Sequence, residues 1–201
     1  MALWSAALSS TGGRFVTRAG DEPFATAAVV IASASTLTLA GAWIFQYGMG
    51  LAPCPLCLEQ RYAYYFAIPV AAMVMLGLSV GSSRKVFTLA FLAIGAALLW
   101  NAGLGAYHAG VEWHWWAGPQ DCAAASPSGS FGPASGLLEQ MQTQRVVRCD
   151  EAAWRFLGLS LAGYNVLISL ALAAVAGFGA ATSWREHKRI EAAEAAEDDA
   201  R

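Results

Sequence analysis

The chain has 201 residues, of which 57% are hydrophobic and 13% are charged, and its formal net charge is −2. A chain with so little polar surface is not an ordinary soluble domain of this length. The composition therefore predicts an integral membrane protein in contact with lipid. We expect no nucleic-acid partner.

Four long stretches without Asp, Glu, Lys or Arg predict the membrane-spanning segments. They lie between Glu22 and Glu59, between Arg61 and Arg84, between Lys85 and Glu112, and between Arg155 and Arg185. A helix needs about 20 mostly apolar residues to cross a bilayer, and each stretch holds one such segment. The predicted helices cover residues 24–47, 62–80, 86–107 and 157–182.

The basic residues predict the orientation of these helices. Eight of them lie in the two tails and in the turn between the second and third helices: Arg14, Arg18, Arg84, Lys85, Arg185, Lys188, Arg189 and Arg201. By the positive-inside rule, these segments are cytoplasmic. We therefore predict an all-α membrane protein, an antiparallel four-helix transmembrane bundle over residues 24–182. Its cytoplasmic tails are 1–23 and 183–201, and its periplasmic loops are 48–61 and 108–156.

Four cysteines fall in these two outer loops. Cys54 and Cys57 form a Cys-x-x-Cys motif, whereas Cys122 and Cys149 have 26 residues between them. Both pairs are therefore expected on one side of the membrane, and the outer side of a bacterial inner membrane is where disulfides persist. Two pairs on one side can exchange disulfides, so the pattern favours redox chemistry at the membrane surface.

The start of the second helix has the residues that such chemistry needs. Pro53 and Pro55 suit the entry into a helix, where the first-turn amides and the helix dipole stabilise a thiolate. Arg61 lies four residues after Cys57 and seven after Cys54, so all three are expected on about the same face. A cation there lowers a thiol pKa and can donate to a carbonyl oxygen of an electron acceptor. The alternative for Arg61 is an interfacial anchor whose charge reaches the head groups.

The residues alone leave other interpretations of the cysteines open. Four thiolates are a common ligand set for structural zinc, although zinc sites usually take two closely spaced pairs. A structural four-cysteine zinc module of the membrane is therefore the alternative function. Two inert structural disulfides are a further possibility.

The sequence resembles the DsbB family of membrane disulfide bond formation proteins. The motifs that carry the resemblance are Gly41-Ala42-Trp43, the run from Leu51 to Arg61 with Cys54-Pro55-Leu56-Cys57, Tyr107-His108, Cys149-Asp150-Glu151, and the run from Trp154 to Gly158. This resemblance implies a quinone-dependent protein-disulfide oxidoreductase of the bacterial inner membrane. It also implies a periplasmic DsbA-type thiol oxidase as partner and a membrane quinone, ubiquinone or menaquinone, as cofactor.

The resemblance also implies a role for each site residue. Cys122 and Cys149 form the loop disulfide, and Cys122 forms the mixed disulfide with the partner. Electrons then pass to Cys54 and Cys57, and Cys57 contacts the quinone ring. His108 matches a family histidine near the quinone, where it can donate a hydrogen bond or pass a proton. Arg61 and His108 are thus the expected quinone-binding residues, and no bound metal is expected.

Overall fold

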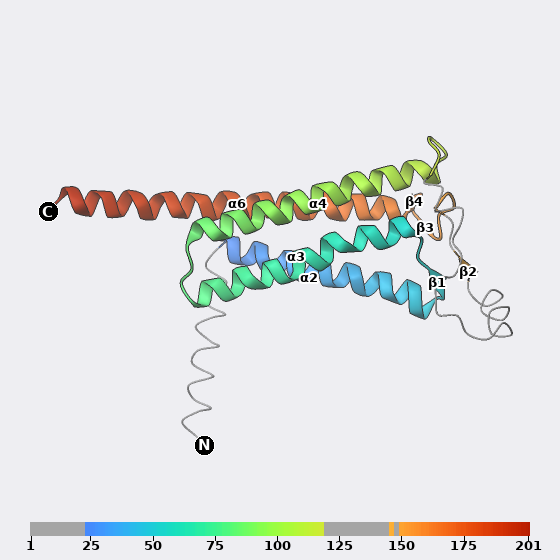
Figure 1. Ribbon diagram of the computed structural model, residues 1–201, viewed down its shortest axis with the longest axis horizontal. Helices are drawn as coiled ribbons and strands as arrows, with labels where there is room; N and C mark the ends of the chain where they lie inside the picture. The colour runs from blue at the N-terminus through green and yellow to red at the C-terminus, as the bar shows by residue number, and fades with distance from the viewer. Residues whose placement is uncertain (1–22, 119–144, 147–148) are drawn as a thin grey trace, which may run out of the picture. The chain divides into compact units, whose positions relative to one another are not determined.

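The structure is a computed structural model that describes residues 23–118, 145–146 and 149–201 (Figure 1). Cys122 and the predicted N-terminal tail up to residue 22 lie outside the described residues. In chain order the described elements are α2 (Pro23–Trp43), η1 (Ile44–Gly48), β1 (Leu51–Ala52), α3 (Pro55–Ser79), α4 (Arg84–Glu112), β2 (Arg145–Val146), β3 (Arg155–Phe156), β4 (Leu159–Ser160) and α6 (Leu161–Asp199).

Four helices of the described part of the chain are long and apolar enough to cross a membrane, which confirms the predicted all-α architecture. They are α2 with its π-helical end η1, α3, α4 and α6. Each predicted apolar segment lies almost wholly inside one of these helices. The prediction of four long apolar helices, each a candidate membrane span, is thus confirmed.

The helix ends differ from the predicted ones. Helix α3 begins at Pro55 rather than Tyr62, α4 continues to Glu112 rather than Tyr107, and α6 continues to Asp199 rather than Thr182. Apolar runs mark only the part of a helix that suits lipid, whereas a helix continues wherever the residues favour it. The end of α6 is rich in Ala and Glu, and its side-chain pairs Lys188–Glu191 and Arg201–Glu197 have the helical spacing that stabilises exposed turns.

The described chain divides into two compact units. One contains residues 23–35, 66–97 and 172–201, and the other contains residues 36–65, 98–118, 145–146 and 149–171. Each long helix contributes one segment to each unit, and successive helices do so in opposite order. Successive helices therefore run in opposite directions, as predicted for an antiparallel bundle.

The unit that holds both ends of the α3–α4 turn is closely packed. Phe91 is fully buried, and a Cβ atom added at Gly179 would lie 2.7 Å from its ring. Phe24 and Phe87 stack with ring centroids 5.8 Å apart, and the Arg84 guanidinium lies 4.8 Å from the Phe24 ring centroid. Small residues thus let the helices approach closely, which is the usual means of helix association in lipid.

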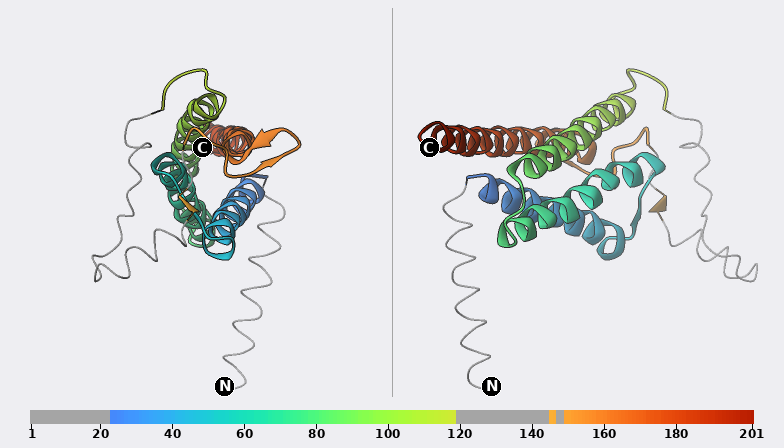
Figure 2. Two further views of the ribbon diagram at one scale, coloured as in Figure 1. Left: turned by 90° about the vertical axis from the view of Figure 1, so that its right-hand side faces the viewer. Right: turned by 60° about the vertical axis from the view of Figure 1, so that its left-hand side comes forward.

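The other unit contains the short strands. Strand β1 pairs with β2 in parallel, whereas β3 and β4 form an antiparallel hairpin, the pair of orange arrows beside the start of α6 in Figure 2. Leu157 and Gly158 connect the hairpin, and both have positive φ, as a two-residue turn of type I′ requires. Ser160 then begins α6, because its Oγ accepts a hydrogen bond from Gly163 N at 3.2 Å. The hairpin and this cap fix where α6 starts beside the site.

Candidate active site

The Cys-x-x-Cys motif forms the first turn of α3. Cys54 is the residue before the helix, and its carbonyl oxygen accepts a hydrogen bond from Leu58 N at 3.1 Å. Its Sγ accepts a hydrogen bond from Cys57 N at 3.3 Å, as an N-cap oxygen does in other helices. Pro55 occupies the first helical position, where its missing N–H costs nothing. The backbone thus directs a helix N-terminus at the Cys54 sulfur, as the sequence predicted.

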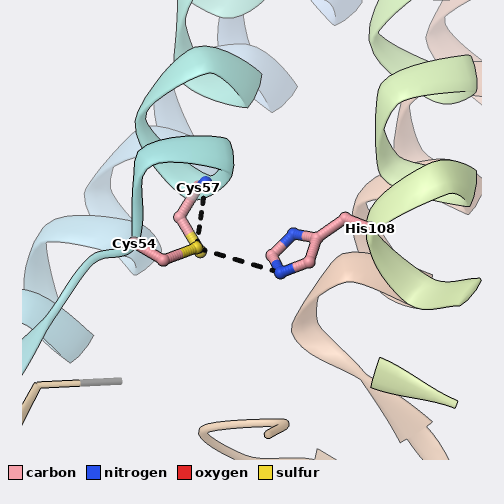
Figure 3. Close-up of side chains that lie close together, drawn as sticks. All are labelled: Cys54, Cys57 and His108. Carbon is pink, nitrogen blue, oxygen red and sulfur yellow. Dashed lines mark hydrogen bonds between the residues drawn. The ribbon is translucent and has the colours of Figure 1, made fainter. Parts of the chain in front are cut away.

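Both sulfurs of the motif are thiols, and they lie 2.8 Å apart (Figure 3). The hydrogen bond between the two sulfurs is the largest of the effects that lower the pKa of Cys54 from 9.0 to about 5. Burial of Cys54 acts in the opposite direction, while contact with His108 and the backbone hydrogen bond lower the pKa further. Cys54 is therefore the thiolate of the pair at neutral pH.

His108 lies across from this pair, on α4 (Figure 3). Its Nε2 is 3.8 Å from Cys54 Sγ, and its Nδ1 is 2.9 Å from Gln60 Nε2. The Gln60 amide is oriented by Asn165, whose Nδ2 donates to Gln60 Oε1 at 2.8 Å. Gln60 Nε2 must then donate to His108 Nδ1, so the ring proton of a neutral His108 lies on Nε2, facing Cys54.

The Asn165 amide is oriented in turn by side chains of α3 and α4. Tyr64 Oη donates to Asn165 Oδ1 at 2.5 Å, and Asn101 Nδ2 lies 3.4 Å from the same oxygen. Ser169 completes the group, since Asn101 Nδ2 donates to its Oγ at 2.9 Å. A buried chain of hydrogen bonds therefore runs from α4 and α6 through Gln60 to His108, and it positions the imidazole against the thiolate.

Glu112 is a buried acid one helical turn after His108. Its Oε1 lies 3.8 Å from His108 Nε2, and both side chains are only 5% exposed. Its Oε2 is buried and has no hydrogen-bond partner among the described residues. The Ser160 hydroxyl and the Arg155 guanidinium also act on this carboxyl, from the hairpin that precedes α6. The site thus contains a carboxylate with a free acceptor beside the thiols.

A cavity of about 310 Å³ opens beside these groups. Cys57 lines it, whereas Cys54 does not. Its polar wall includes Arg61, whose Nη1 donates to Gln46 Oε1 at 2.6 Å. The remaining polar lining residues are Thr38, Gln60, Tyr64, His108, Glu112, Glu151, Tyr164 and Asn165, and apolar residues of α2 and α6 form much of the rest.

Cys149 belongs to the same site. It is 1% exposed, is disulfide-bonded, and lies in one buried apolar cluster with Cys54, Leu56 and Val111. Cys57 packs against this cluster. The structure therefore brings one member of the later cysteine pair to the Cys-x-x-Cys motif, while Cys122 lies outside the described residues.

Most residues that the sequence singled out meet at this place. Cys54, Cys57, His108 and Cys149 are close together, and Arg61 lines the cavity. Sequence reasoning missed Gln60, Glu112 and Asn165. Two features of the sequence could have indicated two of them. Asn165 is an Asn inside an apolar helix, and Glu112 lies four residues after the expected histidine.

The comparisons with known proteins give matches to one family. The family model for the disulfide bond formation protein DsbB matches residues 25–179. A disulfide bond formation protein B of Albidiferax ferrireducens is 33% identical over 71% of this chain and 83% of its own. Proteins of that name from Xanthomonas oryzae pv. oryzae and a Psychrobacter species are each 34% identical. They cover 74% and 69% of this chain and 87% and 81% of their own.

No solved structure matches the chain significantly. The match to the family model nonetheless contains α3 and α4, most of α2, the first half of α6 and every cysteine of the chain. The relatives are similar over most of their own length as well. The chain therefore belongs to the DsbB family of disulfide bond formation proteins, membrane thiol oxidoreductases that reduce quinone.

Proposed function

We propose that this chain reoxidises a periplasmic DsbA-type thiol oxidase and passes the electrons through its two cysteine pairs to a membrane quinone. The observation that carries the proposal is that Cys149 and Cys54 share one buried cluster while Cys57 faces the cavity. The three sulfurs thus lie in the order that a two-step exchange needs.

The first step takes place at the later pair. A thiolate of the partner attacks the Sγ of Cys122 in a Cys122–Cys149 disulfide, and a mixed disulfide forms as that bond breaks. The second partner thiol closes the partner's disulfide and leaves two thiols on this chain. The partner is thereby oxidised by two electrons, and this chain is reduced by the same number.

The second step passes the electrons inward. The Cys149 thiolate attacks the Sγ of Cys54 in an oxidised Cys54–Cys57 pair, and Cys57 leaves as a thiolate on the cavity wall. Cys122 then attacks Cys149 and restores the loop disulfide. The result is the redox state of this structure, with Cys149 in a disulfide and both thiols of the motif free.

The residues of the cavity fit a quinone. The volume of about 310 Å³ and the apolar lining suit a ring, and the Arg61 guanidinium can donate to a carbonyl oxygen. Glu112 Oε2, which has no partner among the described residues, adds a free polar atom to the wall. When bound, a quinone accepts the two electrons and two protons of a dithiol.

The distribution of charge supports a location in the bacterial inner membrane with both cysteine pairs on the periplasmic side. Arg84, Lys85, Arg185, Lys188 and Arg189 belong to one unit of the chain, whereas the three described cysteines belong to the other. The positive-inside rule assigns the first unit to the cytoplasmic side.

The test uses the purified full-length chain, a reduced periplasmic dithiol oxidase and a soluble quinone analogue. We expect the partner's thiols to disappear and the quinone absorbance to fall together, with one disulfide formed per quinone reduced. The Cys149→Ser variant should lose this coupling. Quinone reduction that persists at the wild-type rate in Cys149→Ser would contradict the relay.

A further inference from the structure

The reduced site holds more potential metal ligands than electron transfer requires. The sulfurs of Cys54 and Cys57 and a ring nitrogen of His108 all lie within 4.8 Å of one another. Two thiolates and one imidazole are a ligand set that prefers zinc among the common divalent ions. This set differs from the four-cysteine set of the alternative considered above, because it needs neither member of the later pair.

The distances are close to those of a tetrahedral site. Zinc bonds of about 2.0–2.3 Å place neighbouring ligand atoms roughly 3.3–3.8 Å apart. Cys54 Sγ and His108 Nε2 are already 3.8 Å apart. The two sulfurs, at 2.8 Å, must separate by about 1 Å, which a rotation of the Cys57 side chain towards the cavity provides.

Glu112 becomes the fourth ligand only when its side chain turns towards the sulfurs, because its carboxylate lies outside the group of atoms within 4.8 Å of one another. Its Oε1 is 3.8 Å from His108 Nε2, and its buried Oε2 has no hydrogen-bond partner among the described residues. A buried acceptor without a partner is costly, and coordination to a cation removes that cost. Cys57, His108 and Glu112 all line the cavity, which gives the ion a route to the site.

We propose that the reduced Cys54–Cys57 pair, with His108 and Glu112, forms a zinc-binding site that holds the chain in its reduced state. Binding needs no electron transfer. Zinc displaces the remaining thiol proton, that of Cys57, to solvent, and both thiolates become ligands. A disulfide offers no thiolate, so the oxidised pair does not bind, and a zinc-bound pair does not donate electrons.

The hydrogen-bond chain behind His108 can adapt to the ion. Coordination at Nε2 moves the ring proton to Nδ1, which then needs an acceptor. Rotating the Gln60 amide by a half turn places Oε1 there, and the Asn165 amide can rotate in the same way. Tyr64 and Ser169 have hydroxyls that donate or accept. The chain of hydrogen bonds thus reverses its direction without moving the backbone.

Metal titration of the reduced full-length chain in detergent tests the proposal. The Cys122→Ser/Cys149→Ser background leaves Cys54 and Cys57 as the sulfur ligands of the chain. Zinc binding is measured by competition with a chromophoric chelator, and cobalt serves as a spectroscopic substitute. We expect one ion per chain, with thiolate-to-cobalt charge-transfer bands and the visible bands of a tetrahedral site. The same protein with a Cys54–Cys57 disulfide should bind none.

Single variants assign the remaining ligands. His108→Ala should weaken zinc binding by about 100-fold and Glu112→Gln by about tenfold, whereas Gln60→Glu should tighten it by about tenfold because a carboxylate holds the Nδ1 proton. Glu59→Gln, at an exposed position on α3, is the matched control and should change nothing. Glu112→Gln differs little in shape from the native side chain, so it tests the site even if His108→Ala fails to fold.

Two outcomes overturn the inference. One is the absence of binding to the reduced chain, and the other is equal affinity of wild type, His108→Ala and Glu112→Gln, which would mean adventitious binding by the thiols alone. Only the claim that zinc holds the chain reduced rests on the proposed function. The binding measurement is made without quinone and without partner protein, so its result does not depend on the electron relay. The effect on turnover is then tested by adding zinc to the quinone assay and restoring the rate with a chelator.

Discussion

The two units of the chain use the same helices for different purposes. In the unit with residues 66–97, Gly179 and Phe91 meet at a distance that leaves no room for another methyl group. In the other unit, the helices leave a cavity and bury polar side chains such as Asn101 and Gln60. Close packing therefore stabilises the first unit. The second unit is less closely packed and contains the reactive and polar groups. Substitutions should accordingly affect stability in the first unit and chemistry in the second.

Cys57→Ser should have the largest effect. Serine does not form a disulfide, so we expect no electron transfer to quinone, while helix content and thermal unfolding stay as in wild type. Stopped-flow absorbance of a quinone analogue measures the loss, and circular dichroism measures the fold. Cys122→Ser is the comparison: it should block oxidation of the partner but leave the reaction of a pre-reduced Cys54–Cys57 pair with quinone intact. Equal loss in both single-turnover reactions would argue against separate roles for the two pairs.

The acidity of Cys54 gives the second prediction. With a pKa of about 5 rather than 9.0, this thiol is almost fully ionised at pH 7, so its thiolate fraction is about 100 times that of an ordinary thiol. Thiolate should be present above pH 5 and should disappear as the pH falls through that value. The ultraviolet thiolate absorbance of the reduced chain, minus that of Cys54→Ser, measures the midpoint.

His108→Ala sharpens this prediction. Contact with His108 lowers the pKa of Cys54, so the midpoint should move upward in the variant. Lys85→Ala, at the start of α4 in the other unit, serves as the control and should leave the midpoint unchanged. A wild-type midpoint near pH 9 would show that the site does not activate Cys54.

Arg61→Ala should have a smaller effect on the chemistry. Arg61 lines the cavity and donates to Gln46, so its removal should raise the KM for the quinone analogue by about tenfold with little change in the Cys54 midpoint. Arg61→Lys keeps the charge and should recover part of the loss. Unchanged quinone kinetics in Arg61→Ala would return this residue to the role of an interfacial anchor.

Gly179→Ala should leave the chemistry alone and reduce stability. Its Cβ would meet three atoms of the buried Phe91 ring at 2.7–2.9 Å, so we expect a loss of about 1–3 kcal/mol in the free energy of unfolding. Gly177→Ala is the matched control on the same helix, because a Cβ there has no neighbour within 4 Å. Denaturation in detergent compares the two variants. Equal stabilities would mean that α4 and α6 are not closely packed at Phe91.

The sequence predicts the number and positions of the long helices better than it predicts where they end. It also predicts the reactive cysteines better than it predicts the residues around them. Charge-free stretches report lipid contact, which is why four spans follow from composition. The apolar run of α3 begins only at Tyr62, because Glu59, Gln60 and Arg61 interrupt it although they favour a helix. The helix dipole at Cys54 was nevertheless expected, because prolines and a Cys-x-x-Cys are local signals.

The partners of His108 could not be predicted in the same way. Gln60, Asn165 and Asn101 lie on three different helices, so their contacts depend on how those helices pack. In the sequence, Glu112 marks the end of an apolar stretch, and any charged residue would mark that end equally well. Its burial and its contact with His108 become visible only in the folded site.

The hydrogen-bond chain behind His108 is made of neutral links. The side chains of Gln60, Asn165 and Asn101 are amides, which gain or lose no proton over the range in which proteins fold. The hydrogen bonds that orient the imidazole therefore do not depend on the protonation of these three side chains. A change in pH can therefore alter the charge of the Cys54 thiol without altering the orientation of the histidine beside it.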